Sequence, residues 1–269
     1  MKISIVTPTF NSEATIINNV NSILSQTYSN FEHILIDNES NDNTLDLAKN
    51  VYTRKNSIEK LLIIREKDNG IAEAFNKGIE LADGEIIGIL NSDDYYYNKN
   101  VLDLVNEAFQ DNEIIFVHGN IYFEDEQYGS NIRKPLLCSI TTAMPYNHPT
   151  MFFRKEIYKQ YGGFETSYKF AMDFEFICRL FKSINYFNSR GYFLDGKPLV
   201  TMVAGGASWK NEMDSIEEAK RALKKYDYWN FDARKNYFLR KLRTKIKFWL
   251  SLIKMEKVIT RWRKRKWEN

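Results

Sequence analysis

The sequence predicts an α/β fold with a mixed, mainly parallel sheet, and two observations support this expectation. Short apolar runs of strand length alternate with amphipathic segments of helical period over residues 1–94, which is typical of βαβ units. The run 84–90 is rich in isoleucine and ends abruptly in Asn91-Ser92-Asp93-Asp94. Because ligands bind outside the carboxyl ends of parallel strands, we expect a site at this edge of the sheet.

The N-terminal part contains the most regular elements. We expect strands at 2–6, 31–36, 61–64 and 84–90, and helices at 13–26, 45–51 and 71–81. Each helix repeats apolar residues every three or four positions, and Ser12 or Asn11 is expected to cap the first one. Right-handed crossovers would bring the loops that follow the strands to one edge. These loops are 7–11, 37–43, 67–70 and 91–94.

The pattern changes after Asp94. We expect helices at 101–109 and 170–184, strands at 114–117, 120–123 and 151–153, and a hairpin within 192–203. The hairpin is predicted because Asp195-Gly196 suits a tight turn. Residues 205–208 read as a flexible loop, since they contain two glycines, an alanine and a serine.

Asp93 and Asp94 are adjacent carboxylates at a strand end, where they repel each other. A divalent cation bound together with a diphosphate would relieve this repulsion, because Mg²⁺ is often held by one or two carboxylates and substrate phosphates. The alternative is an ordinary Asp-rich turn, since Asn, Ser and Asp are common turn formers. Both interpretations remain open on these residues alone.

Composition limits the possibilities. A chain of 269 residues with 43% hydrophobic residues fits one α/β domain with an appendage or two small domains. Cys138 and Cys178 have no metal-binding or CxxC spacing, so we expect reduced thiols in a cytosolic protein. We also expect no signal peptide and no membrane span.

The charge is unevenly distributed. Residues 233–269 contain fourteen Lys and Arg against two Glu, a net charge of +12 that leaves −9 on residues 1–232. Within this basic tail, an apolar stripe has helical spacing. It consists of Leu239, Leu242, Ile246, Trp249, Leu250 and Ile253. A basic amphipathic helix can lie in a lipid headgroup layer. Packing of the stripe on the body and nonspecific binding of nucleic acid are the alternatives. We expect part of the stripe to pack and the end to touch a membrane.

Six segments in order resemble the family 2 glycosyltransferases with the GT-A fold, and most closely the bacterial enzymes that build O-antigen, capsule or related surface polysaccharides. The segments are 6–11 (VTPTFN), 36–44 (IDNESNDNT), 68–78 (DNGIA followed by NKG), 91–94 (NSDD), 147–154 (NHPTMFFR) and 172–179 (MDFEF through Arg179). The resemblance implies a GT-A catalytic domain at 1–209 and a basic amphipathic helical tail at 210–269. Within the domain, 1–94 would be the nucleotide-sugar half and 95–209 the acceptor half.

The resemblance also assigns the donor site. The residues that would bind the nucleotide are Thr7, Pro8, Thr9, Asn11, Asp37, Asp68, Gly70, Asn91, Ser92 and Asp94. Asp37 would accept a hydrogen bond from uracil, for which a carboxylate is suited because it only accepts; a cap for the following helix is the alternative. Asp93 would ligate Mn²⁺ or Mg²⁺ and so neutralise the departing diphosphate. Asn91 departs from the family's usual first carboxylate, but its amide could still bind a ribose hydroxyl.

Asp173 matches the catalytic base of the inverting members. A carboxylate within hydrogen-bond reach can take the proton of the acceptor hydroxyl as this attacks the anomeric carbon. The alternative is a carboxylate that interacts with the dipole of its own helix. Glu175 is the second choice, and it points elsewhere on a helix because it is two residues away. His148 would face the acceptor or diphosphate, and Gly206 and Ser208 would belong to a lid.

Together these features predict an inverting, metal-dependent hexosyl- or N-acetylhexosaminyl-transferase. It would move a sugar from a UDP-sugar to a hydroxyl of a glycan, possibly linked to a polyprenyl diphosphate. We expect a cytoplasmic protein at the inner face of the cell membrane, held by the 233–269 tail, with no specific nucleic acid. One alternative is a catalytically inactive nucleotide-sugar-binding scaffold. A nucleotidyltransferase is disfavoured because residues 7–12 contain no Gly, Lys or Arg.

Overall fold

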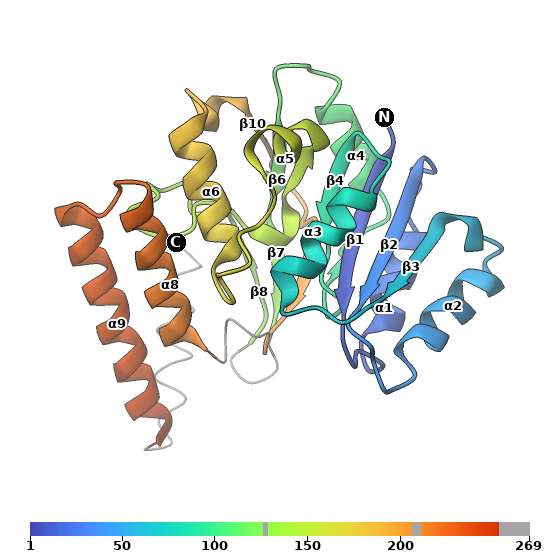
Figure 1. Ribbon diagram of the computed structural model, residues 1–269, viewed down its shortest axis with the longest axis horizontal. Helices are drawn as coiled ribbons and strands as arrows, with labels where there is room; N and C mark the ends of the chain where they lie inside the picture. The colour runs from blue at the N-terminus through green and yellow to red at the C-terminus, as the bar shows by residue number, and fades with distance from the viewer. Residues whose placement is uncertain (126–128, 206–210, 253–269) are drawn as a thin grey trace.

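The computed structural model describes residues 1–125, 129–205 and 211–252. They form a three-layer α/β structure, with three C-terminal helices (α6, α8 and α9) side by side at one end, as Figure 1 shows. The helices are α1 (Ile16–Leu24), α2 (Thr44–Arg54), α3 (Ile71–Leu81), α4 (Val101–Ala108), α5 (Lys155–Tyr161), α6 (Met172–Ser183), α8 (Glu212–Lys225) and α9 (Phe231–Leu252). The α/β class predicted from the sequence is confirmed.

Seven strands in the described residues form the central sheet, in the order β10-β6-β9-β4-β1-β2-β3. Their bounds are β1 (Ile3–Thr9), β2 (Phe31–Asp37), β3 (Leu61–Arg65), β4 (Ile86–Ile89), β6 (Phe116–Gly119), β9 (Phe152–Arg154) and β10 (Gly191–Leu194). Only β9 runs against its neighbours, because it pairs antiparallel with β4 and β6, whereas the other pairs are parallel. The sheet is therefore mixed and mainly parallel, as predicted.

Each face of the sheet is covered by helices, and the alternation of side chains along the strands explains why. On β1, Val6 belongs to the core under α3 and α6, whereas Ile3 and Ile5 belong to the core under α4. On β2, Leu35 packs against α1 and α2. Because successive strand residues point to opposite faces, a strand with apolar residues at nearly every position needs this cover on both sides.

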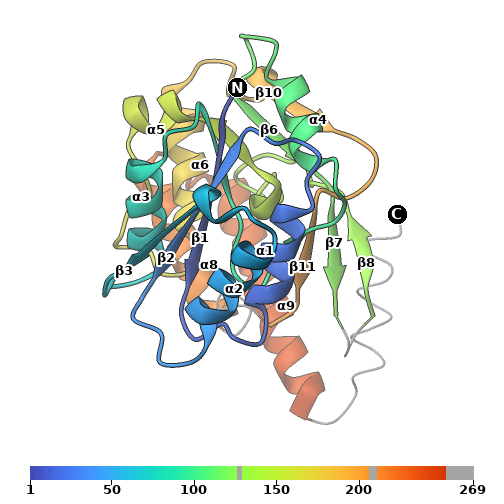
Figure 2. The same cartoon turned by 90° about the vertical axis from the view of Figure 1, so that its right-hand side faces the viewer.

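A second sheet of four strands lies beside the first (Figure 2). It contains β5 (Tyr95–Tyr96), β11 (Val200–Val203), β7 (Ile121–Glu124) and β8 (Asn131–Arg133), in that order. The predicted hairpin within 192–203 is wrong. Its first strand, β10, joins β6 of the central sheet, whereas its second strand, β11, joins β7 and β5. Asp195-Gly196 does form a turn, but the turn carries the chain from one sheet to the other.

Two further local predictions need correction. The first helix is capped at Thr15 rather than at Ser12 or Asn11. Ser12 contributes its carbonyl oxygen, which accepts the N–H groups of Thr15 and Ile16, and Asn11 adopts a positive φ of 48°. The sequence also gave no signal for β5, β8 or α5, which are short.

The C-terminal region forms the helices α8 and α9. Of the apolar stripe that was expected to pack in part on the body, Leu250 is half-buried. Leu239, Leu242, Ile246 and Trp249 are exposed, and Ile253 lies outside the described residues. Helix α9 instead contacts the rest of the protein through the opposite face, which buries Ala233 and Tyr237. None of the helices among the described residues has the length and apolarity needed to cross a bilayer.

Gly78 allows α3 to approach the sheet closely. A Cβ atom at this position would lie 2.2 Å from Cγ1 of Val6 in β1. We expect Gly78→Ala to lower the free energy of unfolding by about 1–3 kcal/mol, the usual cost of overpacking a core, although alanine favours a helix by about 1 kcal/mol. Denaturant unfolding would measure the change, with the exposed Glu80→Ala of the same helix as the control. A Gly78→Ala protein as stable as the wild type would contradict the close packing.

Candidate functional site

The loops after β1, β2, β3 and β4 meet at one edge of the central sheet, as predicted. The N–H of Asn38 donates to the carbonyl oxygen of Thr9 over 3.0 Å, and the N–H of Asp68 donates to Oδ1 of Asn38 over 2.9 Å. The hydroxyls of Ser12 and Ser92 lie 2.8 Å apart. These bonds connect all four loops into one surface.

A polar pocket of about 410 Å³ opens at this edge. Its lining residues are Phe10, Asn38, Glu39, Asn41, Arg65 and Lys67. The volume lies within the range of ligand pockets, and Phe10 is 54% exposed, so a flat ring could contact it. Among these residues, Phe10, Asn38, Glu39 and Asn41 lie in segments that the sequence singled out. Arg65 and Lys67 were missed, although two cations just after a strand were the available signal.

Asp37 lies beneath this pocket and is fully buried. Its carboxylate accepts the N–H of Ser40 over 3.0 Å and the hydroxyl of Ser40 over 2.5 Å, and Nε of Arg65 lies 3.8 Å from Oδ2. The hydroxyl of Ser40 also accepts the N–H of Asn11 over 2.9 Å. Asp37 thus organises the loop that follows its strand, and the exposed groups of the pocket belong to its neighbours.

The residues at the end of β1 differ in their environment. Oγ1 of Thr7 lies 2.9 Å from Nε2 of His33, whose Nδ1 lies 2.7 Å from the hydroxyl of Tyr52. Burial lowers the pKa of His33 to about 3, so this ring is neutral. Thr9 is also buried, but its hydroxyl oxygen has no hydrogen-bond partner among the residues that the structure describes. Since buried polar groups normally have a partner, Thr9 is a better candidate than Thr7 for contact with a ligand.

Residues 91–94 form a turn that is held in place by hydrogen bonds from α1 and β11. The side-chain amide of Asn19 donates to the carbonyl oxygens of Asn91 and Asp94, both over 2.9 Å, and the N–H of Val203 in β11 donates to Oδ1 of Asp94 over 3.3 Å. Oδ1 of Asn91 is buried and has no hydrogen-bond partner within residues 1–125, 129–205 and 211–252. The side chain of Asp93 is half-buried, and in the described part of the chain it accepts no hydrogen bond from another residue.

The two carboxylates of this turn lie in a place that disfavours negative charge. Burial raises the pKa of Asp93. Burial also raises the pKa of Asp94 well above its usual value, and repulsion from Asp93 adds to the effect. A bound cation would reverse both effects, because an opposite charge nearby favours the ionised form. The two carboxylates, together with the buried oxygens of Thr9 and Asn91 that lack partners among the described residues, therefore fit a charged, oxygen-rich ligand with its cation.

A metal ion at Asp93 and Asp94 would need further ligands besides the side chains that the structure describes. Among residues 1–125, 129–205 and 211–252, no group of three His, Cys, Asp or Glu side chains comes close enough to hold an ion. Asp93 and Asp94 supply two carboxylates, and Mg²⁺-type ions commonly complete such a set with phosphate oxygens and water.

Asp68 and Gly70 shape the loop before α3. Oδ1 of Asp68 accepts the N–H of Gly70 over 2.9 Å, and Gly70 has a φ of 145°, which glycine adopts most readily. Burial raises the pKa of Asp68. Both residues lie in the loop bonded to Asn38, so they form part of the pocket's surroundings.

Asp173 is the second residue of α6, and its side chain is half-buried. Its Oδ1 accepts the N–H of Phe174 over 2.8 Å. Burial lowers the pKa of His148, whereas the nearby Asp173 carboxylate acts in the opposite direction. The ring of His148 lies between Phe75 and Phe164, with centroid distances of 6.1 and 6.2 Å. The structure thus brings His148 and Asp173 together.

The short helix η2 (His148–Thr150) connects this pair with the carboxylates of 91–94. It contacts β4, whose end leads into Asn91, and β11, whose Val203 is bonded to Asp94. η2, which carries His148, therefore lies next to the strand that leads into the 91–94 turn and to the strand that is bonded to that turn. Glu175, the second choice for the base, is fully buried in an ion-pair cluster, and Gly206 and Ser208 lie outside the described residues.

Comparison with known proteins agrees with this geometry. Residues 4–181 match the sequence profile described as Glycosyl transferase family 2. A PGL/p-HBAD biosynthesis glycosyltransferase of Mycobacterium bovis (strain BCG / Pasteur 1173P2) is 30% identical over 184 residues, which cover 67% of this chain and 70% of that protein.

Two solved structures have a similar fold. The crystal structure of S. aureus TarS 1–349 in complex with UDP-GlcNAc has a TM-score of 0.65 at 20% identity, and the match covers 83% of this chain and 66% of that one. The mannosyltransferase PcManGT from Pyrobaculum calidifontis, in complex with GDP-Man and Mn²⁺, has a TM-score of 0.64 at 15% identity, with 96% and 82% covered. The chain therefore spans just under two thirds of the TarS chain. On the profile match and the fold, this chain belongs to glycosyl transferase family 2 and has a GT-A-like architecture.

Proposed function

We propose that this protein is an inverting glycosyltransferase that takes a sugar from a UDP-sugar with the help of Mn²⁺ or Mg²⁺. The observation that carries the proposal is the sheet edge itself. There, a polar pocket lies at the ends of β1, β2 and β3, and the turn after β4, which is bonded to the loop after β1 through Ser92 and Ser12, carries two carboxylates of raised pKa. Among the described residues, buried oxygens of Thr9 and Asn91 lack a hydrogen-bond partner. The half-buried Asp173 carboxylate is connected to the same edge through η2.

The pocket between the ends of β1, β2 and β3 would hold the nucleoside. Phe10 offers an exposed ring, Asn38 and Asn41 offer amides that both donate and accept, and Arg65 and Lys67 attract a negatively charged nucleotide. The UDP-GlcNAc bound by TarS and the GDP-Man bound by PcManGT support a nucleotide-sugar donor. We infer a hexosyl or N-acetylhexosaminyl group as the transferred sugar.

Asp93 would hold the cation, and Asp94 would support it from the buried side of the turn. When bound, the cation supplies charge neutralisation for the departing diphosphate. The PcManGT complex with Mn²⁺ supports this assignment. Oγ1 of Thr9 and Oδ1 of Asn91 are left to contact the donor.

Asp173 would act as the general base. Its carboxylate takes the proton of an acceptor hydroxyl while that oxygen bonds to the anomeric carbon. The bond from the anomeric carbon to the diphosphate oxygen breaks on the opposite face, so the configuration is inverted. His148 lies beside Asp173 and would contact the acceptor. We infer a glycan acceptor of a bacterial surface polysaccharide, linked to a polyprenyl diphosphate.

One experiment tests the proposal directly. The purified protein is incubated with a panel of UDP-sugars and Mn²⁺, with and without lipid-linked glycan acceptors, and released UDP is measured. Acceptor-dependent release from at least one donor supports the proposal. Binding of UDP without turnover for any donor and acceptor would instead support the catalytically inactive scaffold.

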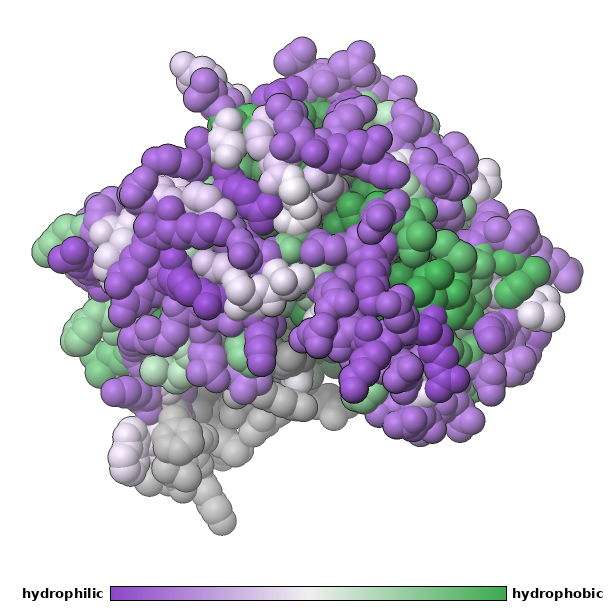
Figure 3. All heavy atoms as spheres, in the orientation of Figure 1, coloured by the Kyte–Doolittle hydropathy of each residue, from purple (hydrophilic) through white to green (hydrophobic). Residues whose placement is uncertain are grey.

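We further propose that α9 attaches the protein to an anionic lipid surface. Its outer face exposes Phe231, Phe238, Leu239, Leu242, Ile246 and Trp249, and Arg234, Lys235, Arg243 and Lys245 are exposed on the same helix. Figure 3 shows apolar side chains at the left margin, over α9. The opposite face is occupied, because Lys241 pairs with Glu217 and Lys247 with Glu212 of α8. Apolar side chains bordered by cations suit the headgroup layer.

A double substitution tests this surface. We expect Phe238→Ser with Trp249→Ser to lower partitioning onto phosphatidylglycerol-containing vesicles by at least about tenfold, because burial of each large apolar side chain is worth about 1.5–3 kcal/mol. Vesicle co-sedimentation would measure the change. The control is Ile58→Ser, which replaces an exposed apolar residue of η1 (Ile58–Lys60), outside α9. Wild-type partitioning of the double variant would remove the lipid surface as the partner of α9.

A further inference from the structure

The C-terminal half of helix α8 is hydrogen-bonded to the segment 165–175, which includes the first turn of α6 and carries Asp173. The contacts come from four side chains on successive turns of α8 and just after it, namely Glu218, Arg221, Lys225 and Tyr226. In Figure 1, α8 lies between α6 and α9. The segment that carries the proposed base is thus held by residues that follow the catalytic domain predicted from the sequence.

Glu218 makes the contacts nearest to Asp173. Its Oε1 accepts the N–H of Lys169 over 2.9 Å, and its Oε2 accepts those of Phe170 and Ala171 over 2.8 and 3.0 Å. Ala171 is the N-cap position of α6. A side chain from another helix therefore binds the backbone N–H groups just before α6, where a negative charge is also favoured by the helix dipole.

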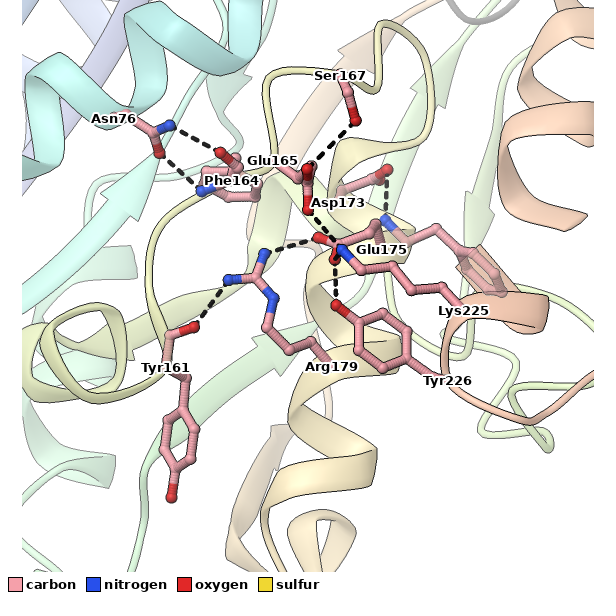
Figure 4. Close-up of polar contacts among 11 residues, drawn as sticks. Asn76, Tyr161, Phe164, Glu165, Ser167, Asp173, Glu175, Arg179, Lys225 and Tyr226 are labelled. Carbon is pink, nitrogen blue, oxygen red and sulfur yellow. Dashed lines mark hydrogen bonds and ion pairs between the residues drawn. The ribbon is translucent and has the colours of Figure 1, made fainter. Parts of the chain in front are cut away.

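Glu175 is the second attachment point of this segment, and it lies in the first turn of α6, two residues after Asp173. It is fully buried and contacts Arg179 over 2.7 Å, Lys225 over 3.1 Å and the hydroxyl of Tyr226. Figure 4 shows these groups around the Glu175 carboxylate, with Asp173 on the adjoining part of the turn. A buried carboxylate needs such partners, because an uncompensated buried charge is strongly destabilising.

Two cations extend the attachment to the preceding loop. Lys225 also pairs with Glu165 over 2.5 Å, and Arg221 donates to the carbonyl oxygen of Ser167 over 2.7 Å while its guanidinium lies 4.0 Å from the ring centroid of Tyr168. Burial alone would lower the pKa of Lys225, but hydrogen bonds to Glu165 and Glu175 hold that pKa above its usual value. Lys225 therefore stays charged as it joins the two carboxylates.

We propose that α8 is the positioning element of the proposed general base, with Glu218 as its main positioning residue. Among the described residues, the Asp173 carboxylate accepts a hydrogen bond from the adjacent Phe174 N–H, so the location of this carboxylate is set by the backbone of residues 169–175. Glu218 binds the backbone of residues 169–171. The first turn of α6 is fixed through the side chain of Glu175, which contacts Lys225 and Tyr226. The acceptor half then extends beyond 209 to include residues 211–226. This inference rests on the proposed role of Asp173.

The test compares two neighbouring glutamates of α8. Glu218→Gln removes the charge that binds residues 169–171. Glu217→Gln makes the same change at a residue that pairs with Lys220 and Lys241 and not with the segment. We expect Glu218→Gln to lower kcat at least tenfold, with the Kd for UDP unchanged within twofold. We expect Glu217→Gln to keep the wild-type kcat. Equal kcat values for both variants and the wild type would overturn the proposal. So would a loss of UDP binding in parallel with kcat, which indicates general damage.

Hydrogen exchange gives a second measurement that needs no turnover. In Glu218→Gln, the amides of Lys169, Phe170 and Ala171 should exchange at least tenfold faster, with β1 and β4 unaffected. In Glu217→Gln, they should exchange as in the wild type. If exchange responds in this way but no UDP-sugar is turned over by the wild type, the proposed function fails while the contact stands. If exchange at these amides is unchanged in Glu218→Gln, the positioning role itself is refuted.

Discussion

Replacing Asp173 by Asn is expected to lower kcat for sugar transfer by about 10²–10⁴-fold, the usual contribution of a general base, while the Kd for UDP stays the same. Asparagine has the same shape as aspartate and can still accept the N–H of Phe174, but its amide cannot take a proton. Single-turnover transfer with saturating donor would measure the chemical step, and calorimetry would measure UDP binding.

The control addresses the alternative that Asp173 only interacts with the dipole of its helix. Asp214 is an exposed first-turn aspartate of α8, so Asp214→Asn makes the same change at an equivalent helix position. Such an interaction is worth about 0.3–1 kcal/mol, which both variants would lose in stability. If Asp173→Asn retains wild-type kcat, the base must be sought elsewhere.

Replacing Asp93 by Asn is expected to lower kcat/KM by about 10²–10³-fold, since charge stabilisation by a metal is worth several kcal/mol and each 1.36 kcal/mol is a factor of ten. In the same variant, a higher Mn²⁺ concentration should be needed to reach half of the maximal rate. The substitution also removes the repulsion that raises the pKa of Asp94. The melting temperature of the protein without metal should therefore stay the same or rise.

Asp83 provides the matched control for Asp93. It is exposed and precedes β4, at the opposite end of the strand from Asp93. Asp83→Asn should leave both kcat/KM and the Mn²⁺ dependence as in the wild type. Equal loss of activity in the two variants would point to nonspecific damage, and full activity in Asp93→Asn would exclude it as a metal ligand.

The fold could be predicted where local patterns determine the structure. Helix α3 begins and ends at the predicted residues, because its amphipathic repeat follows a clear turn at Asp68-Asn69-Gly70. The hairpin was wrong for the opposite reason. Asp195-Gly196 correctly indicated a turn, but a turn does not specify which strands its neighbours pair with, and β10 and β11 pair with β6 and β7.

The sequence predicted which edge of the sheet carries the site, but not how the individual side chains are arranged there. Thr7 and Thr9 are two residues apart on β1, so their side chains point to the same face of the sheet. Only the position of His33 on the adjacent strand, where it contacts Thr7, makes their environments different. The sequence also did not reveal which face of α9 packs against the rest of the protein. Its repeat shows an apolar face, but Tyr237 and the ion pairs with α8 turn the other face inward. Such choices depend on partners that are distant in the sequence.

The way in which Glu218 holds residues 169–171 has a consequence for which substitutions this segment tolerates. Its carboxylate recognises three main-chain N–H groups, which every amino acid except proline provides. The exposed side chain of Lys169 can therefore change without loosening the anchor, whereas Ala171 is buried and is also constrained by packing. One acid on α8 thus fixes the course of the main chain independently of the side chain that position 169 carries.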